Sequence, residues 1–318
     1  HGQRQAPCPV NCVGLVTMSI IGKVLFDADV FTETDALGAA VSVAIEHIDY
    51  VFSHLIAVPL SWPLPRHRRT RQALSFLRAR IQEMIDERRQ GSVERDDFLS
   101  ILLRTRDEDG CPMSDTQIRD EALTLFGAGH ETTATALTWA WYLLATRPDI
   151  YAQVRHEVDS VLRGRSPEYG DLPHLPYTLQ VLKEAMRLFP PAYVLSRVAL
   201  HDVAMEPYPV RRHETVVMSP YTIHRRPDYF ADPTRFDPER FTPENEAKLS
   251  RYAYMPFGAG PRVCIGSHFA LMEGHLLLAA IAQRATFELV PGQRIVPNPM
   301  VTLRPQGGIQ MVVRRRAA

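Results

Sequence analysis

Apolar positions recur with helical spacing through most of the first two thirds of the chain. Between Arg66 and Gln90 they fall three or four residues apart among many arginines, and Gly91 follows as a helix-stop residue. These apolar positions are Ala73, Leu74, Leu77, Ile81, Met84 and Ile85. The pattern predicts an amphipathic helix over residues 66–90 whose arginines face solvent.

The next predicted helix is the longest and the most apolar. It begins after Ser114, which forms a capping box with Gln117, and it continues to Thr146 ahead of Pro148. A helix of roughly 32 residues extends about 48 Å at its rise of about 1.5 Å per residue. Its middle, EALTLFGAGHETTATALTWAWYLL, is apolar on nearly every side. This helix is therefore expected to be buried on nearly every side.

Three more helices and a region of short strands complete the predicted order of elements. Helices are expected over residues 150–162, 177–188 and 267–285, and glycine or proline follows the first two as a stop signal. After Pro191 short β-type runs appear, such as ETVVMSPYTI, and VTLRPQGGIQMVVRRR predicts a closing β-hairpin that turns at residues 306–308. The sequence predicts a mainly α-helical protein with a small β region, folded as a single domain over residues 1–318.

Charge and hydropathy argue against two classes of partner. The 36 basic and 36 acidic side chains balance, so the net charge does not favour nucleic acid or an anionic membrane. A membrane-spanning helix needs about 20 consecutive apolar residues. The most apolar early stretch, Val10–Phe26, is interrupted by Gly14, Gly22 and Lys23 and lacks the basic start of a signal peptide. We expect a soluble protein with no membrane segment and no nucleic-acid partner.

The four cysteines do not form a disulfide scaffold in a chain of 318 residues, and they indicate a reducing, cytoplasmic setting. Cys8 and Cys12 form a CxxxC pair with no histidine or further cysteine nearby, which makes metal binding there the weaker interpretation. Cys111 stands alone. Only Cys264 lies in a stretch of unusual composition.

That stretch, FGAGPRVCIG at residues 257–266, places Cys264 among glycines just before the helix predicted over 267–285. Unpaired N–H groups at a helix N-terminus favour negative charge, and so favour the thiolate form. Gly258, Gly260 and Gly266 let the backbone pass close to a bulky planar partner. A buried structural cysteine in a glycine-rich turn is the alternative. The full spacing Phe-x-x-Gly-x-Arg-x-Cys-x-Gly favours a ligand site.

The stretch resembles the haem-binding loop of the cytochromes P450. The resemblance implies that Cys264 is the axial thiolate ligand of the iron in haem b, which favours O–O cleavage. It also implies that Phe257 shields the sulfur and that Arg262 pairs with a haem propionate. Gly258 and Gly266 would then border the haem.

A second segment, AGHETT at residues 128–133, lies in the middle of the long helix. The glycines at 127 and 129 each cost about 1 kcal/mol relative to alanine inside a helix, and a structural helix gains nothing from them. The segment resembles the oxygen-activation site of the family, which implies a locally loosened helix with Ala128 and Gly129 against the haem. Thr132 would hydrogen-bond the oxygen that is activated, and Glu131 would relay protons.

The third resemblance joins two segments. Glu184 and Arg187, in KEAMR, lie three residues apart on one helix, and an isolated pair of this kind is commonplace and contributes only about 0.2–0.5 kcal/mol. Together with FDPERF, residues 236–241, the pair matches the Glu-x-x-Arg of the family and its later arginine, here Arg240. The resemblance implies a buried charge network that holds the region beneath the haem.

Weaker matches concern propionate binding and the substrate pocket. Arg197 matches a second propionate-binding arginine, with an ordinary surface arginine as the alternative, and His224 in TIHRRP is a lesser candidate. Two largely apolar segments match those that line the substrate pocket in the family and favour an apolar substrate. They are Ala192, Tyr193, Val194 and Leu195, and Val301, Thr302 and Leu303.

The resemblance covers the chain from about residue 20 to its end, and the family's N-terminal third, with its propionate-gripping Trp-x-x-x-Arg, is not found. It implies a monomeric monooxygenase that inserts one atom of O2 into a lipid, terpenoid or xenobiotic. Its electrons would come from a ferredoxin or a flavoprotein reductase. One alternative is a truncated remnant without turnover or without haem. Another is a peroxide-using relative, against which the Glu131–Thr132 pair argues.

Overall fold

The computed structural model describes residues 7–8, 11–27, 34–54, 58–91 and 95–316. The side chains of Cys8 and Cys12 lie outside the described residues, so the CxxxC prediction is not addressed. The chain divides into two compact units, residues 10–134 and residues 135–318 with 1–9. The division falls inside helix α5 (Asp115–Thr146), and a single domain stays a prediction.

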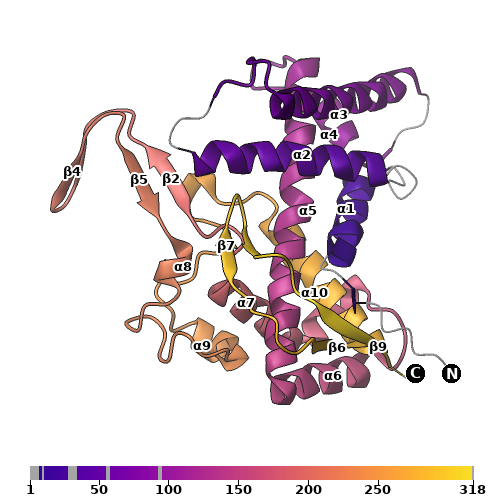
Figure 1. Cartoon of the computed structure of the whole chain (residues 1–318), viewed down its shortest axis with the longest axis vertical. Coiled ribbons are helices and arrows are strands. Elements are labelled where there is room, and N and C mark those ends of the chain that lie inside the picture. Colours follow the sequence, from indigo (N-terminus) through magenta and orange to yellow (C-terminus); the bar gives the residue numbers. More distant parts are fainter. Residues whose placement is uncertain (1–6, 9–10, 28–33, 55–57, 92–94, 317–318) are drawn as a thin grey trace. The chain divides into compact units, whose positions relative to one another are not determined.

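The unit of residues 10–134 is helical (Figure 1). Besides the first part of α5, its described helices are α1 (Asn11–Phe26), α2 (Thr34–Ser53), α3 (Pro65–Gln90) and α4 (Phe98–Arg104). A buried ion pair joins Arg88 of α3 to Asp97, whose carboxylate also caps α4 by accepting the Ser100 N–H at 2.8 Å. The helix predicted over 66–90 is confirmed as α3.

In its described residues, the unit of residues 135–318 with 1–9 combines helices with four small antiparallel sheets. Its helices are α6 (Pro148–Leu162), η2 (Tyr169–His174), α7 (Pro176–Leu188), α8 (Pro220–Ile223), η3 (Pro238–Phe241), α9 (Pro243–Glu246), η4 (Gly260–Arg262) and α10 (Ser267–Arg284). Its strands are β1 (Pro7–Cys8), β2 (Leu195–Val198), β3 (Val203–Met205), β4 (Tyr208–Val210), β5 (Thr215–Met218), β6 (Ala285–Leu289), β7 (Pro297–Pro299), β8 (Leu303–Pro305) and β9 (Met311–Arg315).

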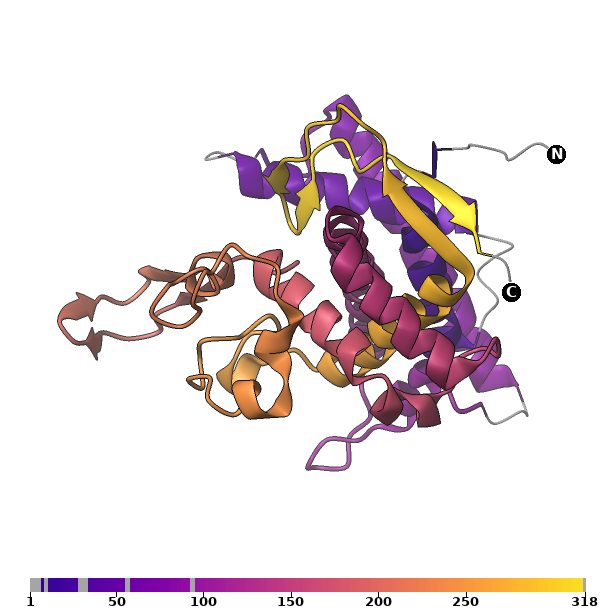
Figure 2. The ribbon, with the colours of Figure 1, turned by 90° about the horizontal axis from the view of Figure 1, so that it is seen from below.

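The sheets are ordered β1-β9-β6, β2-β5, β3-β4 and β7-β8. In Figure 2 the gold and yellow strands β6 and β9 lie side by side, and they pair from Ala285 opposite Arg315 to Leu289 opposite Met311. The β3–β4 hairpin projects away from the helices of its unit in both views (Figures 1 and 2). This arrangement matches the predicted mainly helical fold with a small β region.

The predicted closing hairpin is wrong. A turn does form at Gly307 and Gly308, which both have a positive φ, as a tight turn through glycine requires. The strands on its two sides have other partners, because β8 pairs with β7 and β9 pairs with β6 and β1. Strand β9 thus takes partners distant in sequence, whereas β8 pairs with β7, the strand just before it.

The caps of the long helix follow the prediction. Ser114 donates its backbone N–H to Oε1 of Gln117 at 2.9 Å, and the Gln117 N–H donates to Oγ of Ser114 at 3.3 Å. This reciprocal pair satisfies N–H groups that the first turn leaves free.

None of the described helices is long and apolar enough to cross a membrane.

Candidate functional site

Residues 257–266, the Cys264 loop, are closed by backbone hydrogen bonds. The Cys264 N–H donates to the Phe257 carbonyl at 2.9 Å, and the Gly258 N–H donates to the Met255 carbonyl at 3.1 Å. Gly258 and Gly260 have φ values of +75° and +72°, a region that other residues enter only at a cost. The glycines predicted from the sequence therefore shape the loop.

Cys264 is exposed at the surface of this loop, three residues before α10 begins. Its neighbours are apolar and also exposed, Val263 at 51% and Ile265 at 85%. A methyl group added at Gly266 would lie 3.9 Å from the Cys264 sulfur, an ordinary contact distance. The loop thus presents a single sulfur within an apolar surface.

These residues fit the haem that the sequence resemblance implies. A haem iron would take a single cysteine thiolate from the protein, because the macrocycle itself supplies most of its ligands. Within the described ranges, no group of three or more histidine, cysteine or acidic residues is arranged to hold a metal ion. An exposed lone cysteine on an apolar loop suits a thiolate-ligated macrocycle better than a bare ion.

The candidate propionate partners lie on and beside this loop. Arg262 ends η4 within the loop and is exposed. Arg197 is an exposed residue of β2 and donates from Nη1 to the Ser196 carbonyl at 2.8 Å. A Cβ built at Gly258 would lie 3.7 Å from Cδ1 of Leu195, so the first residue of β2 packs against the loop. Phe257, the predicted shield, is half-buried.

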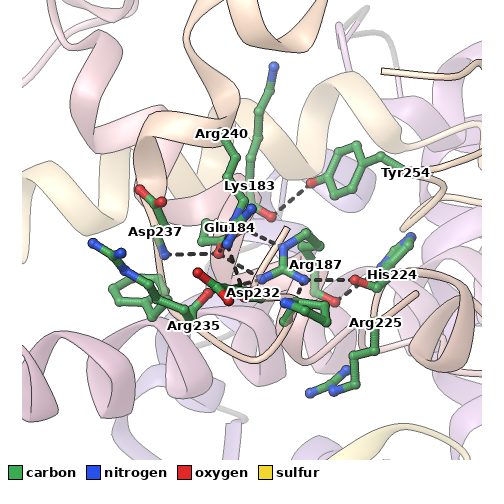
Figure 3. Close-up of polar contacts among 12 residues, drawn as sticks. Lys183, Glu184, Arg187, His224, Arg225, Asp232, Arg235, Asp237, Arg240 and Tyr254 are labelled. Atoms are coloured by element: carbon green, nitrogen blue, oxygen red, sulfur yellow. Dashed lines mark hydrogen bonds and ion pairs between the residues drawn. The ribbon is translucent and has the colours of Figure 1, made fainter. Parts of the chain in front are cut away.

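Glu184 and Arg187 form a fully buried ion pair on α7, drawn in Figure 3. Arg187 donates from Nε to Oε2 of Glu184 at 2.6 Å and from Nη2 to Oε1 at 2.8 Å. Its remaining donors reach the carbonyls of His224 and Pro233, both at 2.7 Å, and of Arg235 at 3.2 Å. One guanidinium therefore fixes α7 to three points in the loop of residues 224–235.

Arg240 completes the predicted network. Its Nε lies 3.5 Å from Oε1 of Glu184, and its Nη2 donates to the Asp232 carbonyl at 3.0 Å. The Asp237 N–H also donates to Oε1 of Glu184, at 2.9 Å. Burial raises the pKa of the Glu184 carboxyl, and the hydrogen bonds and charge of Arg187 oppose that rise. The three residues expected from the sequence are thus brought together in one cluster (Figure 3).

His224 takes a larger part in this cluster than the sequence indicated. The side chain is fully buried, and its Nδ1 lies 3.1 Å from the Arg187 carbonyl. Its Nε2 accepts the Met255 N–H at 2.9 Å. Nearby, the Tyr254 hydroxyl donates to the Lys183 carbonyl at 3.0 Å. No local sequence signal reports these partners, which lie more than 30 residues away along the chain.

Acidification is expected to destabilise the protein through His224. Burial lowers the pKa of His224 from 6.5 to about 4. The unfolded chain therefore binds a proton that the folded chain excludes. The stabilisation that comes from a neutral His224 is complete above the pKa of this histidine in the unfolded chain. As the pH drops from about 6.5 to about 4, the free energy of unfolding falls by up to about 1.4 kcal/mol per pH unit. Urea unfolding of the wild type and His224→Gln across this range isolates the effect, and a difference that does not vary with pH would count against it.

The segment of residues 128–133 differs from the prediction in one respect. Helix α5 continues unbroken through it, so the expected local loosening is not seen in this helix, all of which the structure describes. Thr132 donates its hydroxyl to the Ala128 carbonyl at 2.9 Å, and Thr133 donates to the Gly129 carbonyl at 3.2 Å. Both hydroxyls are thus held by the carbonyl four residues earlier. Glu131 is buried.

Gly129 has a packing role that the sequence did not reveal. A Cβ at Gly129 would lie only 2.8 Å from Cδ1 of Ile21 on α1, closer than side chains approach. Beside it, Thr17 of α1 donates from Oγ1 to the His130 carbonyl at 3.0 Å. The expectation that a structural helix gains nothing from this glycine is therefore wrong, because Gly129 lets α1 pack closely on α5.

The two predicted substrate-lining segments lie together. The Leu303 N–H donates to the Pro191 carbonyl at 3.0 Å, and the Tyr193 hydroxyl donates to the Met300 carbonyl at 2.9 Å. Trp139 donates from Nε1 to the Leu303 carbonyl at 2.7 Å. Of the seven predicted residues, Thr302 and Leu303 are buried, Val194 is exposed, and the half-buried ones are Ala192, Tyr193, Leu195 and Val301.

Comparison with known proteins places this chain among named relatives. The family described as Cytochrome P450 matches residues 2–313. Cyclooctatin synthase of Streptomyces melanosporofaciens is 42% identical over 252 residues, which cover 79% of this chain and 55% of that protein. Pentalenene oxygenase of Streptomyces avermitilis is 38% identical over 241 residues, which cover 76% of this chain and 54% of that protein. The crystal structure of the cytochrome P450DA heme domain matches with a TM-score of 0.90 at 28% identity, covering 99% of this chain and 70% of that one. The chain spans about half the length of these curated relatives.

Proposed function

The chain belongs to the cytochrome P450 family, and from that membership we propose that it acts as a haem-thiolate monooxygenase on an apolar organic substrate. The observation that carries the proposal is the exposed Cys264 on a glycine-shaped, apolar loop just before α10. When bound, haem b supplies the activation of O2, with one atom inserted into the substrate and the other reduced to water.

The residues of the Cys264 loop have distinct tasks in this proposal. Cys264 holds the iron as a thiolate, helped by its place before the first turn of α10, where free N–H groups favour negative charge. Arg262 and Arg197 orient the group by pairing their exposed guanidinium charges with its propionates. Phe257 and the apolar neighbours of the sulfur limit the access of water to it.

Thr132 and Glu131 supply protons in this proposal. The Thr132 hydroxyl is half-buried and is anchored at the Ala128 carbonyl, so its oxygen has a fixed position from which it can accept and pass on a proton. Glu131, the preceding residue, is buried and provides a carboxyl group that can deliver protons to that hydroxyl. Both lie on one turn of the unbroken helix α5.

Replacing Thr132 with alanine is expected to leave haem content unchanged while lowering product formation by about 10²-fold, the usual contribution of a positioned proton donor. The electrons consumed should then appear as hydrogen peroxide. The matched control is Thr124→Ala, because Thr124 makes the same type of bond on α5, to the Asp120 carbonyl at 2.7 Å. Product and peroxide are measured per electron donor consumed, and an unchanged product yield in Thr132→Ala would remove this role.

The substrate class follows from the relatives and from the lining segments. One relative is named pentalenene oxygenase, and the apolar side chains of Val194, Leu195, Val301 and Leu303 in the lining segments suit a hydrocarbon of that kind. Pentalenene is therefore the first probe, with a ferredoxin and its flavoprotein reductase as electron donors. Under ¹⁸O2 the product should carry the label. Label that enters only from H2¹⁸O would contradict a monooxygenase.

A further inference from the structure

We propose that His224 is a positioning residue for Cys264. Its imidazole joins the C-terminal end of α7 to the segment that leads into the Cys264 loop, and so it fixes where the thiol lies on the helix framework. The inference concerns the proposed thiolate site, but the contacts that carry it belong to the protein alone. It can therefore be tested both with and without haem.

The two bonds of the ring define its tautomer. The Arg187 carbonyl can only accept a hydrogen bond, so Nδ1, 3.1 Å away, must carry the proton. The Met255 N–H can only donate, so Nε2, 2.9 Å away, must carry the lone pair. His224 is therefore a neutral bridge that donates to α7 and accepts from the loop. A protonated ring could not accept from Met255.

The rest of the residue is also held. Its backbone N–H donates to the Pro220 carbonyl at 2.8 Å, and its carbonyl accepts from Nη1 of Arg187 at 2.7 Å (Figure 3). Arg187 thus contacts His224 twice, through its guanidinium and through its own carbonyl. The side chain is fully buried and both ring nitrogens are hydrogen-bonded, which holds the orientation of the ring. This rigid support makes the bond to Met255 a fixed point rather than a mobile contact.

From Met255 the path to the sulfur is short. The Met255 carbonyl accepts the Gly258 N–H at 3.1 Å, and the Phe257 carbonyl accepts the Cys264 N–H at 2.9 Å. Two successive backbone bonds thus connect the anchored residue to Cys264. The neighbouring Tyr254 hydroxyl bonds the Lys183 carbonyl at 3.0 Å, and its ring centroid lies 5.3 Å from that of His224. The Tyr254 bond holds the same segment to α7 a second time.

A second buried histidine provides the matched control. His275, on α10, is 3% exposed, and its Nε2 lies 2.8 Å from the Leu175 carbonyl, at the start of α7. Removal of this bond also removes one buried hydrogen bond of a histidine, but at the opposite end of α7 from His224. A general loss of stability would affect the two histidines alike, whereas a positioning role belongs to His224 alone.

The variants separate the two bonds of His224. In His224→Asn the amide nitrogen takes the place of Nδ1, so the bond to α7 is kept and the bond to Met255 is lost. In His224→Gln the amide oxygen takes the place of Nε2, so the bond to Met255 is kept. Amide hydrogen exchange of residues 255–264 is measured in the full chain without haem. One buried hydrogen bond contributes about 1.4 kcal/mol at the upper end of its range, which corresponds to roughly tenfold in exchange.

We expect exchange of residues 255–264 to rise about tenfold in His224→Asn and less than about threefold in His224→Gln. His275→Asn should leave this segment within about threefold of the wild type. With haem added, His224→Asn should also shift the band of the carbon monoxide complex from the thiolate toward the thiol position. Equal exchange in His224→Asn and His275→Asn, or Asn and Gln variants that behave alike, would overturn the proposal. A chain that fails to bind haem would count against the proposed function only.

The wild-type tautomer gives a test that needs no variant. With ¹⁵N-labelled histidine, nuclear magnetic resonance should show His224 protonated at Nδ1 and unprotonated at Nε2 at neutral pH. A ring protonated at Nε2 would be unable to accept the Met255 N–H, and the proposal would be wrong. This measurement can contradict the proposal even if every His224 variant fails to fold.

Discussion

Replacing Arg187 with methionine is expected to lower the free energy of unfolding by about 3–5 kcal/mol, the usual cost of stranding one member of a buried ion pair. Methionine keeps much of the side-chain volume, so the loss is mainly electrostatic. Glu184 would remain fully buried without the two hydrogen bonds that it accepts from Arg187, and the carbonyls of His224, Pro233 and Arg235 would lose their donors. Urea unfolding of the haem-free chain measures the change.

Arg226→Met provides the control. Arg226 pairs with Asp228 at the surface, where both side chains are about half exposed, and such pairs contribute little to stability because solvent screens them. The double variant Glu184→Leu with Arg187→Met should be more stable than Arg187→Met alone, because the fully buried carboxylate is then gone and only Arg240, which is 13% exposed, loses an ion pair. It should still be less stable than the wild type, since the three carbonyls stay without their partner. A loss below about 1 kcal/mol in Arg187→Met would show that the pair does not support this region.

Replacing Cys264 with alanine is expected to abolish every spectral sign of a thiolate-bound haem while leaving the haem-free fold intact. The side chain is exposed, so its removal should change the free energy of unfolding by no more than about 0.5 kcal/mol. The loop bond from the residue 264 N–H to Phe257 belongs to the backbone and survives the change. The variant would therefore lose the iron ligand while keeping the fold of the loop.

Cys111→Ala is the matched control, because Cys111 is also an exposed free cysteine. That variant should keep the thiolate spectrum at full intensity. Absorption spectra of both variants, reconstituted with haem under the same conditions, are compared with the wild type. If Cys264→Ala keeps the thiolate band, another residue ligates the iron and the assignment of the site fails.

Features encoded in neighbouring residues could be predicted from the sequence. The Ser114–Gln117 capping box marked the start of α5, and the apolar spacing over 66–90 marked α3. Glu184 and Arg187 lie three residues apart on one helix, so their pairing followed from helix geometry. Features that depend on distant partners could not be predicted. Strand β9 pairs with β6 rather than with β8, and Gly129 is required by the approach of Ile21.

The role of His224 also depends on residues distant in sequence. Its burial and its two ring bonds depend on Arg187, 37 residues earlier, and on Met255, 31 residues later. In the sequence it stands before two arginines, a setting typical of an exposed loop. Only the fold shows that α7 and the segment before the Cys264 loop approach it from opposite sides. The hydrogen-bond partners of such a buried polar residue are set by the tertiary structure and cannot be predicted from its neighbours in sequence.

The carbon monoxide difference spectrum of the reduced 318-residue chain shows whether Cys264 and its loop hold haem through a thiolate. We expect a red-shifted Soret band, the one typical of a thiolate-ligated haem with carbon monoxide bound, which is present in the wild type and absent in Cys264→Ala. A band typical of a protonated thiol or a histidine ligand, or no haem absorbance at all, would contradict it.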